Sequence, residues 1–421
     1  MTNHPVSSRR HFIKRSLAAC AATTSLIGTQ QSPTRAAVSP GEEIIIGFIG
    51  CGNGAKQLME QVPSPGRIVA AADCFVPRAE EASRLRGDGK WAVYQDYRRM
   101  LDQERLDAVV VATPDHVRTL PCIHAVQAGL DVYAEKPLTA YVREGRRLVD
   151  EVRRNQRIFQ VGSQQRTMEI NRFCCEFVRQ GRLGKITKVL GVNYPGPRPN
   201  VDLPEEAVPT GDDWDAWCGP TQLRPFNSQL QFGWMQWHDY SGGEMTNWGA
   251  HGVDQIQWAL GKSLTGPVEL WPESPGLNGK TAMRYADGTL VSFELESGPM
   301  GGAIFIGTEA KMEINRNRFA VNPDDFVTDA PPPEVQGKWE GDGWIARPHI
   351  QNWLDCIKSR ETPNADVEIG HRSVTVCHLL NIVRELGRKL NWDPDAEQFV
   401  GDAEANALLE RPRRAGYELP S

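Results

Sequence analysis

Short apolar runs alternate with helix-like segments through the first half of the chain. In the helix-like segments the apolar residues follow the spacing of one face of an α-helix. We expect strands at Ile44–Ile49, Ile68–Ala72, Ala108–Ala112, Val132–Ala134 and Ile158–Val161, and helices that include Pro121–Ala128 and Val142–Val152. Such alternation is typical of a parallel sheet with crossover helices. The pattern therefore predicts an α/β domain over residues 43–166.

The pattern changes beyond Arg166. Its parts are a Trp- and Pro-rich stretch (192–237), a helix, two strand-like regions (279–296 and 303–314), a Pro- and Asp-rich stretch (322–344) and an amphipathic helix from about 371 to 390. The Pro- and Asp-rich stretch is expected to be a long surface excursion. We predict a second, α+β domain over residues 167–421, in which a large open and mainly antiparallel sheet receives the substrate pocket and supports oligomerisation.

The amino-terminal residues have the pattern of an export signal. Residues 8–14 read Ser-Arg-Arg-His-Phe-Ile-Lys, and a weakly apolar stretch, Leu17–Gly28, follows them. This order is typical of a twin-arginine leader, although two arginines alone also fit an ordinary basic end. The apolar stretch is too short to cross a bilayer of about 30 Å as a helix. We therefore expect a leader over residues 1–37, export of the folded chain by the twin-arginine machinery to the periplasm, and no integral membrane segment.

Composition narrows the function further. The chain has 421 residues, 40% of them hydrophobic, and a net charge of -6. Since no basic stretch lies outside the leader, nucleic acid is not an expected partner. The nine cysteines form no C-x-x-C pair, and most lie in apolar patterns, so they are interpreted as buried thiols; the pair Cys174–Cys175 has no interpretation from sequence.

A glycine turn follows the first expected strand directly. It reads Gly50-Cys51-Gly52-Asn53-Gly54-Ala55 and opens a helix. In a dinucleotide-binding turn, Gly50 allows the tight bend and Gly52 lets the backbone approach the pyrophosphate. Asp73 ends the second strand about 20 residues later, where a carboxylate binds the ribose 2′-hydroxyl and repels a 2′-phosphate. The turn predicts NAD rather than NADP, although the nearby Arg78 weakens this preference; the alternative is a plain turn with Asp73 as a helix cap.

Three later strand ends are expected at the same edge of the sheet. The predicted cofactor-binding residues there are Thr113, Pro114 and His116 after the third strand, Glu135, Lys136 and Pro137 after the fourth, and Gln164 after the fifth. Ligands bind at the carboxyl ends of strands in open α/β sheets. An ammonium group beside a positively charged nicotinamide and away from water should have a lowered pKa, which suits Lys136 to exchange protons with a substrate hydroxyl. The alternative is an ordinary surface lysine in a loop.

Together these motifs resemble the glucose-fructose oxidoreductase, inositol dehydrogenase and rhizopine catabolism family (Gfo/Idh/MocA). The resemblance rests on the glycine turn, Asp73, the Ala-Thr-Pro-x-His and Glu-Lys-Pro turns, and the segment Gly243–Asp254. It implies a Rossmann domain followed by a glyceraldehyde-phosphate-dehydrogenase-like domain, activity on sugars and polyols, and pairing into homo-oligomers. The family's catalytic lysine matches Lys136, and its peptide bond before the following proline is often cis.

The segment Gly243–Asp254 carries a second group of candidates. Asn247, His251 and Asp254 would share one helical face, because residues three or four apart are neighbours. In sugar dehydrogenases of the family the place of Asn247 is commonly Asp. An amide cannot take a proton, so the proton work is expected to shift to Lys136 and His251, with Asp254 in support. Alternatively, Thr246 or Asn247 caps the helix and His251 is a packed side chain.

Other polar and aromatic residues give weaker signals. The histidines and acids His238, Asp239, Glu244 and His251 cluster, but no H-x-x-x-H or thiolate spacing supports a metal site, so none is predicted. Trp237 and neighbouring tryptophans are candidates for stacking on a sugar, with the protein core as the alternative. Arg166 is placed either near the substrate or in an ion pair between domains.

The sequence thus predicts an NAD-dependent oxidoreductase that transfers a hydride to or from a hydroxyl-bearing carbon of a sugar, polyol or glycoside. Because nicotinamide cofactors are abundant only inside the cell, an exported enzyme would load NAD before export and hold it tightly. Tight retention also favours an alternative: a redox-neutral glycosidase, in which the sugar is oxidised transiently and then reduced again. A third alternative is a nucleotide-bound sugar-binding protein without turnover.

Overall fold

The computed structural model describes residues 42–332, 334–335 and 345–420. The predicted leader, residues 1–37, lies outside the described residues, as does part of the predicted surface excursion. No helix within the described ranges is long and apolar enough to span a membrane.

The first sheet has six parallel strands in the order β3-β2-β1-β4-β5-β6. They are β1 (Ile44–Ile49), β2 (Gly66–Ala72), β3 (Ala92–Tyr94), β4 (Ala108–Val111), β5 (Asp131–Ala134) and β6 (Phe159–Val161). The five predicted strands are all present. The sixth strand, β3, was not predicted. It has only three residues, all half-buried at the edge of the sheet, and they are not part of a longer apolar run.

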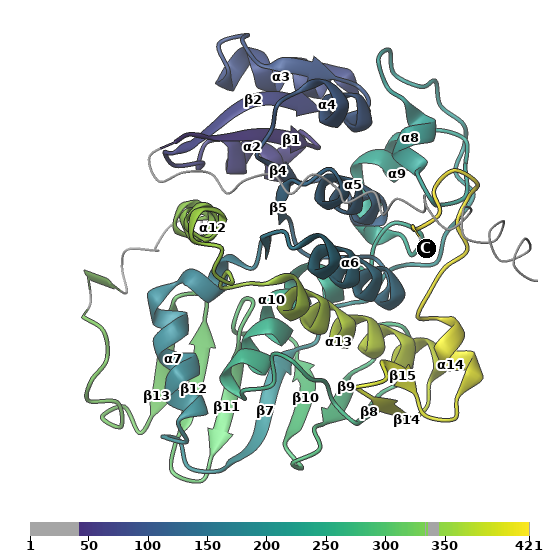
Figure 1. The fold of residues 1–421 in the computed structure, drawn as a ribbon. Coiled ribbons are helices and arrows are strands. Elements are labelled where there is room, and N and C mark those ends of the chain that lie inside the picture. Colours follow the sequence, from purple (N-terminus) through teal and green to yellow (C-terminus); the bar gives the residue numbers. More distant parts are fainter. Residues whose placement is uncertain (1–41, 333, 336–344, 421) are drawn as a thin grey trace, which may run out of the picture. The chain divides into compact units, whose positions relative to one another are not determined.

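Helices cover both faces of this sheet. Along β4, Val109 and Val111 face a core with α4 (Tyr97–Gln103), α5 (Asp115–Gln127) and α6 (Val142–Asn155). Ala108 and Val110 face the opposite core with α2 (Asn53–Met59), α3 (Val76–Arg86) and α12 (Arg347–Ser359). Because α12 comes after most strands of the second sheet in the chain, a segment of the carboxyl-terminal half returns to complete the first domain (Figure 1).

The second sheet has nine strands in the order β13-β12-β11-β7-β10-β9-β8-β14-β15. They are β7 (Ile186–Val192), β8 (Glu269–Pro272), β9 (Thr281–Arg284), β10 (Leu290–Leu295), β11 (Ala303–Gly307), β12 (Lys311–Asn315), β13 (Arg318–Asn322), β14 (Leu390–Asp393) and β15 (Gln398–Phe399). Only β7 and β10 pair in parallel among the pairings described. The predicted fold class, a Rossmann-like domain with a mainly antiparallel α+β domain, is confirmed.

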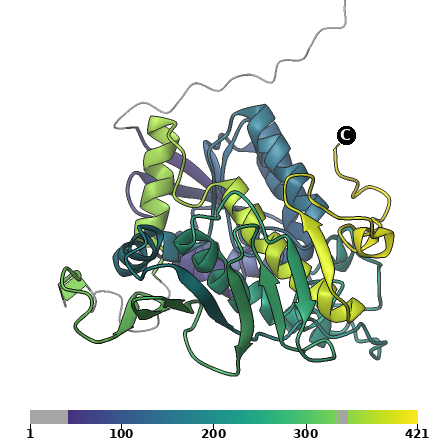
Figure 2. The same ribbon diagram turned by 90° about the horizontal axis from the view of Figure 1, so that it is seen from below.

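Three helices pack on one face of the second sheet: α7 (Glu169–Arg179), α10 (Glu244–Ala259) and α13 (Val367–Leu386). The uninterpreted pair Cys174–Cys175 lies on α7, and both thiols are buried in this core. In Figure 2, which shows the molecule from below, the longer yellow-green helix, α13, runs behind the strands of this sheet. Shorter elements are η1 (Gln164–Thr167), α8 (Trp214–Cys218), α9 (Ser228–Phe232), η2 (Trp234–Gln236) and α14 (Ala403–Ala407).

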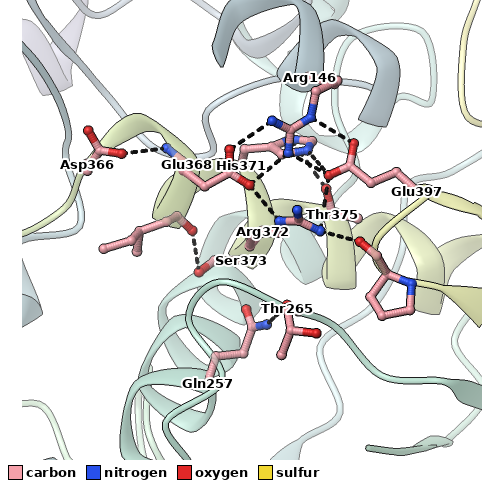
Figure 3. A network of polar contacts seen from close by, with 12 residues as sticks. Arg146, Gln257, Thr265, Asp366, Glu368, His371, Arg372, Ser373, Thr375 and Glu397 are labelled. Atoms are coloured by element: carbon pink, nitrogen blue, oxygen red, sulfur yellow. Dashed lines mark hydrogen bonds and ion pairs between the residues drawn. The ribbon is translucent and has the colours of Figure 1, made fainter. Parts of the chain in front are cut away.

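A polar network joins α6 of the first domain to α13 (Figure 3). Arg146 donates to both oxygens of Glu368 at 2.7 and 2.8 Å and to both oxygens of Glu397 at 2.7 and 3.0 Å. His371 Nε2 lies 2.8 Å from Glu397, and Arg372 donates to Glu368 at 2.7 Å. The two carboxylates are therefore shared by cations from both domains, which fixes α13 between the first domain and the second sheet.

Candidate functional site

A cavity of about 610 Å³ lies at the carboxyl ends of the strands in the first sheet. Its lining includes most of the predicted cofactor-binding residues: Gly50, Gly52, Asn53, Asp73, Arg78, Thr113, Pro114, His116, Glu135, Lys136 and Pro137. Asn247 of α10 also lines it, so the second domain contributes to the same cavity. Open α/β sheets bind ligands at this edge, where successive strand ends meet.

The glycine turn leaves room for a phosphate group. Gly50 has a φ of +87°, and an added Cβ would lie 2.8 Å from the backbone of Ala112 and Thr113. No heavy atom lies within 4 Å of the position that a Cβ on Gly52 would take. Gly50 therefore brings β1 close to the end of β4, while Gly52 leaves open space above the turn, as a bound pyrophosphate requires.

Asp73 ties this turn to the end of β2. Its Oδ2 accepts a hydrogen bond from the Cys51 N–H at 2.7 Å, and its Oδ1 accepts one from the Phe75 N–H at 2.9 Å. Burial raises the pKa of Asp73, and the two backbone hydrogen bonds oppose this rise. Arg78 lies nearby with its guanidinium carbon 5.4 and 5.5 Å from the ring centres of Phe75 and Phe232. The carboxylate thus has a fixed orientation at the cavity wall.

His116 forms part of the wall that faces α8. Its ring lies 4.8 Å from the rings of both Trp217 and Tyr240, and its Nε2 is 2.7 Å from the Trp217 carbonyl oxygen. Burial lowers the pKa of His116 to about 3, so the imidazole is neutral at pH 7. Because a carbonyl oxygen only accepts, Nε2 carries the proton and donates it to Trp217.

Lys136 meets α10 at the end of the cavity. Its Nζ donates to Asn247 Oδ1 at 2.6 Å, and Asn247 Nδ2 in turn donates to Glu244 at 3.0 Å. Behind Lys136, the buried Glu135 accepts hydrogen bonds from the Lys136 N–H at 3.2 Å and from Gln164 at 3.3 Å. Burial lowers the pKa of Lys136 below the ordinary lysine value, against the opposing charge of Glu135. The peptide bond between Lys136 and Pro137 is cis.

His251 lies one turn beyond Asn247 on α10 and is buried. Burial, together with the positive charges of Lys136 and Arg316, lowers the pKa of His251 well below the usual value. The imidazole is therefore neutral at pH 7 and can accept a hydrogen bond. Arg316 reaches this region from the turn between β12 and β13, where its guanidinium carbon lies 5.3 Å from the Trp248 ring centre.

The alternative cap role of Thr246 or Asn247 is not found, because Gly243, with a φ of +71°, occupies the N-cap position of α10. Asn247 therefore lies inside the first turn, where its amide is free to contact Lys136.

Three predicted substrate residues lie outside the cavity lining. Arg166 donates to the carboxylate of Asp254 at 2.8 to 3.0 Å, and Ser373 donates to the same carboxylate at 2.6 Å. Both ionic side chains are buried, so this is the ion pair that the sequence left as an alternative. Trp237 is buried in an aromatic cluster with Trp214 and Trp217, not exposed for stacking. Each of these side chains thus packs or pairs within the protein, and their contact with a substrate stays a prediction.

Other residues of the cavity carried no signal in the sequence. They are Gln95, Tyr97, His124, Ala216, Phe232, Arg413 and Tyr417. They come from the loop between β3 and α4, from α4, α5, α8 and α9, and from the carboxyl-terminal end, and only the tertiary fold brings them together. Across the residues described, no group of three or more His, Cys, Asp or Glu side chains is placed to hold a metal ion.

Comparison with known proteins finds inositol dehydrogenases among the relatives. The chain is 32% identical over 112 residues to scyllo-inositol 2-dehydrogenase (NAD(+)) of Bacillus subtilis, a match that covers 27% of this chain and 32% of the relative. It is 25% identical over 261 residues to inositol 2-dehydrogenase 2 of Saccharopolyspora erythraea, covering 60% and 63%. The matched part thus spans about a third to just under two thirds of these curated relatives.

The fold is similar to that of the WlbA dehydrogenase from Bordetella pertussis, solved in complex with NADH and UDP-GlcNAcA. The TM-score is 0.61 at 20% identity, and the match covers 85% of this chain and 99% of that structure. Residues 44–163 match the family described as "Oxidoreductase family, NAD-binding Rossmann fold", and residues 197–419 match "Oxidoreductase family, C-terminal alpha/beta domain". The chain therefore belongs to the Gfo/Idh/MocA oxidoreductase family.

Proposed function

We propose that this chain is an NAD-dependent oxidoreductase that acts on a hydroxyl-bearing carbon of a sugar or polyol. The observation that carries the proposal is the contact between Lys136 Nζ and Asn247 Oδ1 at the end of the cavity. It joins the strand-end lysine of the NAD-binding domain to the second domain, at the place where a substrate would meet the cofactor. The inositol dehydrogenases among the relatives support a polyol substrate.

The residues of the cavity fit a dinucleotide. The open space at Gly52 suits the pyrophosphate, and the buried carboxylate of Asp73 suits a ribose hydroxyl while repelling a 2′-phosphate. NAD is therefore favoured over NADP. Among the contacts described, Arg78 lies against the rings of Phe75 and Phe232 and forms no ion pair with a carboxylate. When bound, the nicotinamide would accept or return the hydride.

Side chains of this protein would take up and return the proton of the substrate hydroxyl. A lysine whose pKa is lowered by burial holds a larger neutral fraction near pH 8 than an exposed lysine, and the neutral amine can take the proton of a substrate hydroxyl. Asn247 fixes Nζ, since its oxygen accepts from the ammonium group and its NH₂ is held by Glu244. The neutral His251 lies one turn further along the same helical face, outside the cavity lining, and is a second candidate acceptor for the proton.

The direct test is NADH formation from NAD with myo-inositol, scyllo-inositol and a panel of hexoses. Lys136→Ala is expected to lower kcat by about 10² to 10⁴, the usual contribution of a general base. Lys188→Ala is the matched control, because Lys188 pairs with Glu294 on the second sheet and lies outside the cavity lining. Unchanged turnover in Lys136→Ala would rule out the proposed proton transfer.

A second candidate is the redox-neutral cleavage of a glycoside with a cofactor recycled in place. It is favoured by the cavity walls: residues of α8 and of the carboxyl-terminal end line the cavity together with the glycine turn, which suits a retained cofactor. Aryl glycosides distinguish the two reactions. Aglycone release at constant NADH would support cleavage, whereas NADH formation in proportion to product would support net oxidation. Sugar binding by the wild type, with neither NADH formation nor aglycone release, would favour a sugar-binding protein without turnover.

We further propose that the chain is exported with NAD already bound and works as a homo-oligomer in the periplasm. The twin-arginine pattern at Arg9 and Arg10 supports export of a folded, loaded protein. Cell fractionation of the wild type and of an Arg9→Lys, Arg10→Lys variant tests the route, since the variant should remain in the cytoplasm. Light scattering coupled to size-exclusion chromatography tests the oligomer, and a monomer at micromolar concentration would contradict it.

A further inference from the structure

The carboxyl-terminal end of the chain returns to the nucleotide cavity. Beyond α14, residues 411–419, here called the C-terminal segment, extend toward α8, as Figure 1 shows in yellow beside teal. Arg413, Gly416 and Tyr417 of this segment line the cavity, as do Ala216 and Trp217 of α8. We propose that the C-terminal segment holds α8 in place over the cavity and thereby slows the release of the dinucleotide. This inference rests on the proposed function.

The segment around α8 lies beside the end of β2, where Asp73 would bind the adenosine ribose of the dinucleotide. The Asp213 N–H donates to the Cys74 carbonyl oxygen at 2.9 Å, and the Val76 N–H donates to the Gly211 carbonyl oxygen at 3.0 Å. These two bonds attach the start of α8 to the loop that carries Asp73. At the other end of the helix, the Trp217 carbonyl oxygen accepts the bond from His116. The first domain thus contacts α8 at two strand ends.

Arg414 attaches the C-terminal segment to α8. Its Nε donates to the Gly219 carbonyl oxygen at 2.9 Å, and its two terminal nitrogens donate to the Asp215 carboxylate at 2.8 and 3.3 Å and to the Asp215 carbonyl oxygen at 2.9 Å. The Tyr417 hydroxyl donates to the same carboxylate at 3.3 Å. The hydrogen bonds from Arg414 lower the pKa of Asp215. A guanidinium that bonds two carbonyl oxygens at the carboxyl end of a helix and a carboxylate holds position and orientation together.

The other end of the C-terminal segment is fixed to the first domain. Arg411 Nε donates to the buried Glu144 of α6 at 2.9 Å, and another of its nitrogens donates to the His116 carbonyl oxygen at 2.6 Å. Arg413 also pairs with Glu144, whose side chain is 1% exposed. The C-terminal segment is therefore fixed to the buried Glu144 of α6 through Arg411 and Arg413, and to Asp215 of α8 through Arg414. For α8 to move away from the cavity while the anchor at Glu144 stays in place, the contacts of Arg414 must break in addition to those of α8 with Cys74 and His116.

The contacts do not resemble ordinary terminal packing. Arg388, by comparison, pairs with Asp402 and Glu404 near α14, and none of these residues lines the cavity. It offers a comparison arginine that also makes charge-assisted hydrogen bonds, in this case to two acidic side chains, but away from α8 and the cavity lining. Comparing the two alanine variants therefore shows whether the position of the arginine beside α8 matters, and not only the loss of a charged side chain.

The test measures release of NADH from the full-length protein. Protein loaded with NADH is mixed with a large excess of NAD, and the decay of bound-NADH fluorescence gives the rate of release. Arg414→Ala is expected to release NADH about tenfold faster than the wild type, since several charge-assisted bonds are lost. Asp215→Ala removes the other partner of the same contact and should give a similar increase. Arg388→Ala should release NADH at the wild-type rate.

Thermal unfolding of each variant in the absence of dinucleotide shows whether it is folded, and the two substitutions at one contact guard against failure of either variant. Wild-type release rates in folded Arg414→Ala and Asp215→Ala would overturn the role of the C-terminal segment while leaving dinucleotide binding intact. A wild-type protein that binds neither NAD nor NADH would instead remove the proposed function, and this inference with it. Faster release in Arg388→Ala to the same extent would also count against it.

Discussion

Lys136 Nζ lies 2.6 Å from Asn247 Oδ1, although the two residues are 111 positions apart in the chain. The lysine follows β5 of the first sheet, and the asparagine lies in the first turn of α10 in the second domain. The amide supplies a neutral acceptor at the place where sugar dehydrogenases of the family commonly carry a carboxylate. An ammonium group facing an amide is less stabilised than one facing a carboxylate, so Asn247 leaves Lys136 easier to deprotonate.

Asn247→Asp tests this relationship. A carboxylate beside Nζ favours the charged ammonium and raises the pKa of Lys136. If the neutral lysine accepts the substrate proton, oxidation rises with pH as Lys136 loses its proton, and the variant should move this limb of the kcat profile upward by about one to two pH units. Asn247→Ala removes the acceptor without adding charge and serves as the control. An unshifted limb in Asn247→Asp would mean that another group titrates in it.

Arg316 provides a second test of the same lysine. It lies in the turn between β12 and β13 with a φ of +37°, and its positive charge acts to lower the pKa of both Lys136 and His251. Removing a like charge should raise both pKa values, so Arg316→Ala is expected to shift the oxidative limb upward by roughly half to one pH unit. Arg318→Ala, on the exposed side of the same hairpin, should leave the profile in place. Equal shifts in both variants would indicate a general charge effect.

The fold was accessible from sequence because the alternation of apolar runs is local. Each strand of the first sheet except β3 follows from its own residues, and the glycine turn with Asp73 lies within a single βαβ unit. The return of α12 to the first domain was not accessible. Its apolar face fits any core, and nothing within Arg347–Ser359 specifies that Trp353 packs against the first sheet rather than the second.

In the candidate site too, some residues could be predicted from the local sequence and others depend on tertiary contacts. Lys136 and His116 follow strands, so topology alone places them at the cavity. Arg166, Asp254 and Trp237 lie in or next to recognisable motifs, but their partners decide their role, and Arg166 pairs with Asp254 across 88 positions. A position in or next to a motif is therefore not enough to predict that a side chain contacts the substrate. Arg414 gave no signal, because its partners on α8 lie 199 positions earlier in the chain.

Asp73 should control the choice of dinucleotide. Asp73→Ser removes the carboxylate that favours a ribose hydroxyl and repels a 2′-phosphate, while Arg78 remains at the cavity wall. The ratio of kcat/KM for NAD to that for NADP is expected to fall by about tenfold to a hundredfold. Asp88→Ser is the control, because Asp88 is exposed in the same domain. A ratio that does not change would place the ribose elsewhere in the cavity.

The network around Glu368 should make the protein sensitive to acid. Burial acts to raise its pKa, but hydrogen bonds from Arg146 and Arg372 outweigh this and lower the pKa of Glu368 to about 2. Because the folded pKa is below the unfolded one, about 4.3, the stabilisation is complete above pH 4.3 and is lost as pH falls toward 2. Glu368→Gln should lower the free energy of unfolding at pH 7 by about 1 to 3 kcal/mol, between the values for exposed and buried pairs.

Urea denaturation between pH 7 and pH 3 measures this free energy. The difference between wild type and Glu368→Gln should be constant from pH 7 to about pH 5 and should shrink below the unfolded pKa of about 4.3, because the wild-type carboxylate then gains protons on unfolding. Glu404→Gln is the matched control: Glu404 bonds Arg388, its side chain is 68% exposed, and its loss should cost less than about 1 kcal/mol at every pH. A difference for Glu368→Gln that is the same at pH 7 and pH 3 would mean that packing, not the paired charge, supplies the contribution of Glu368, and the link between α6 and α13 would then not depend on ionisation.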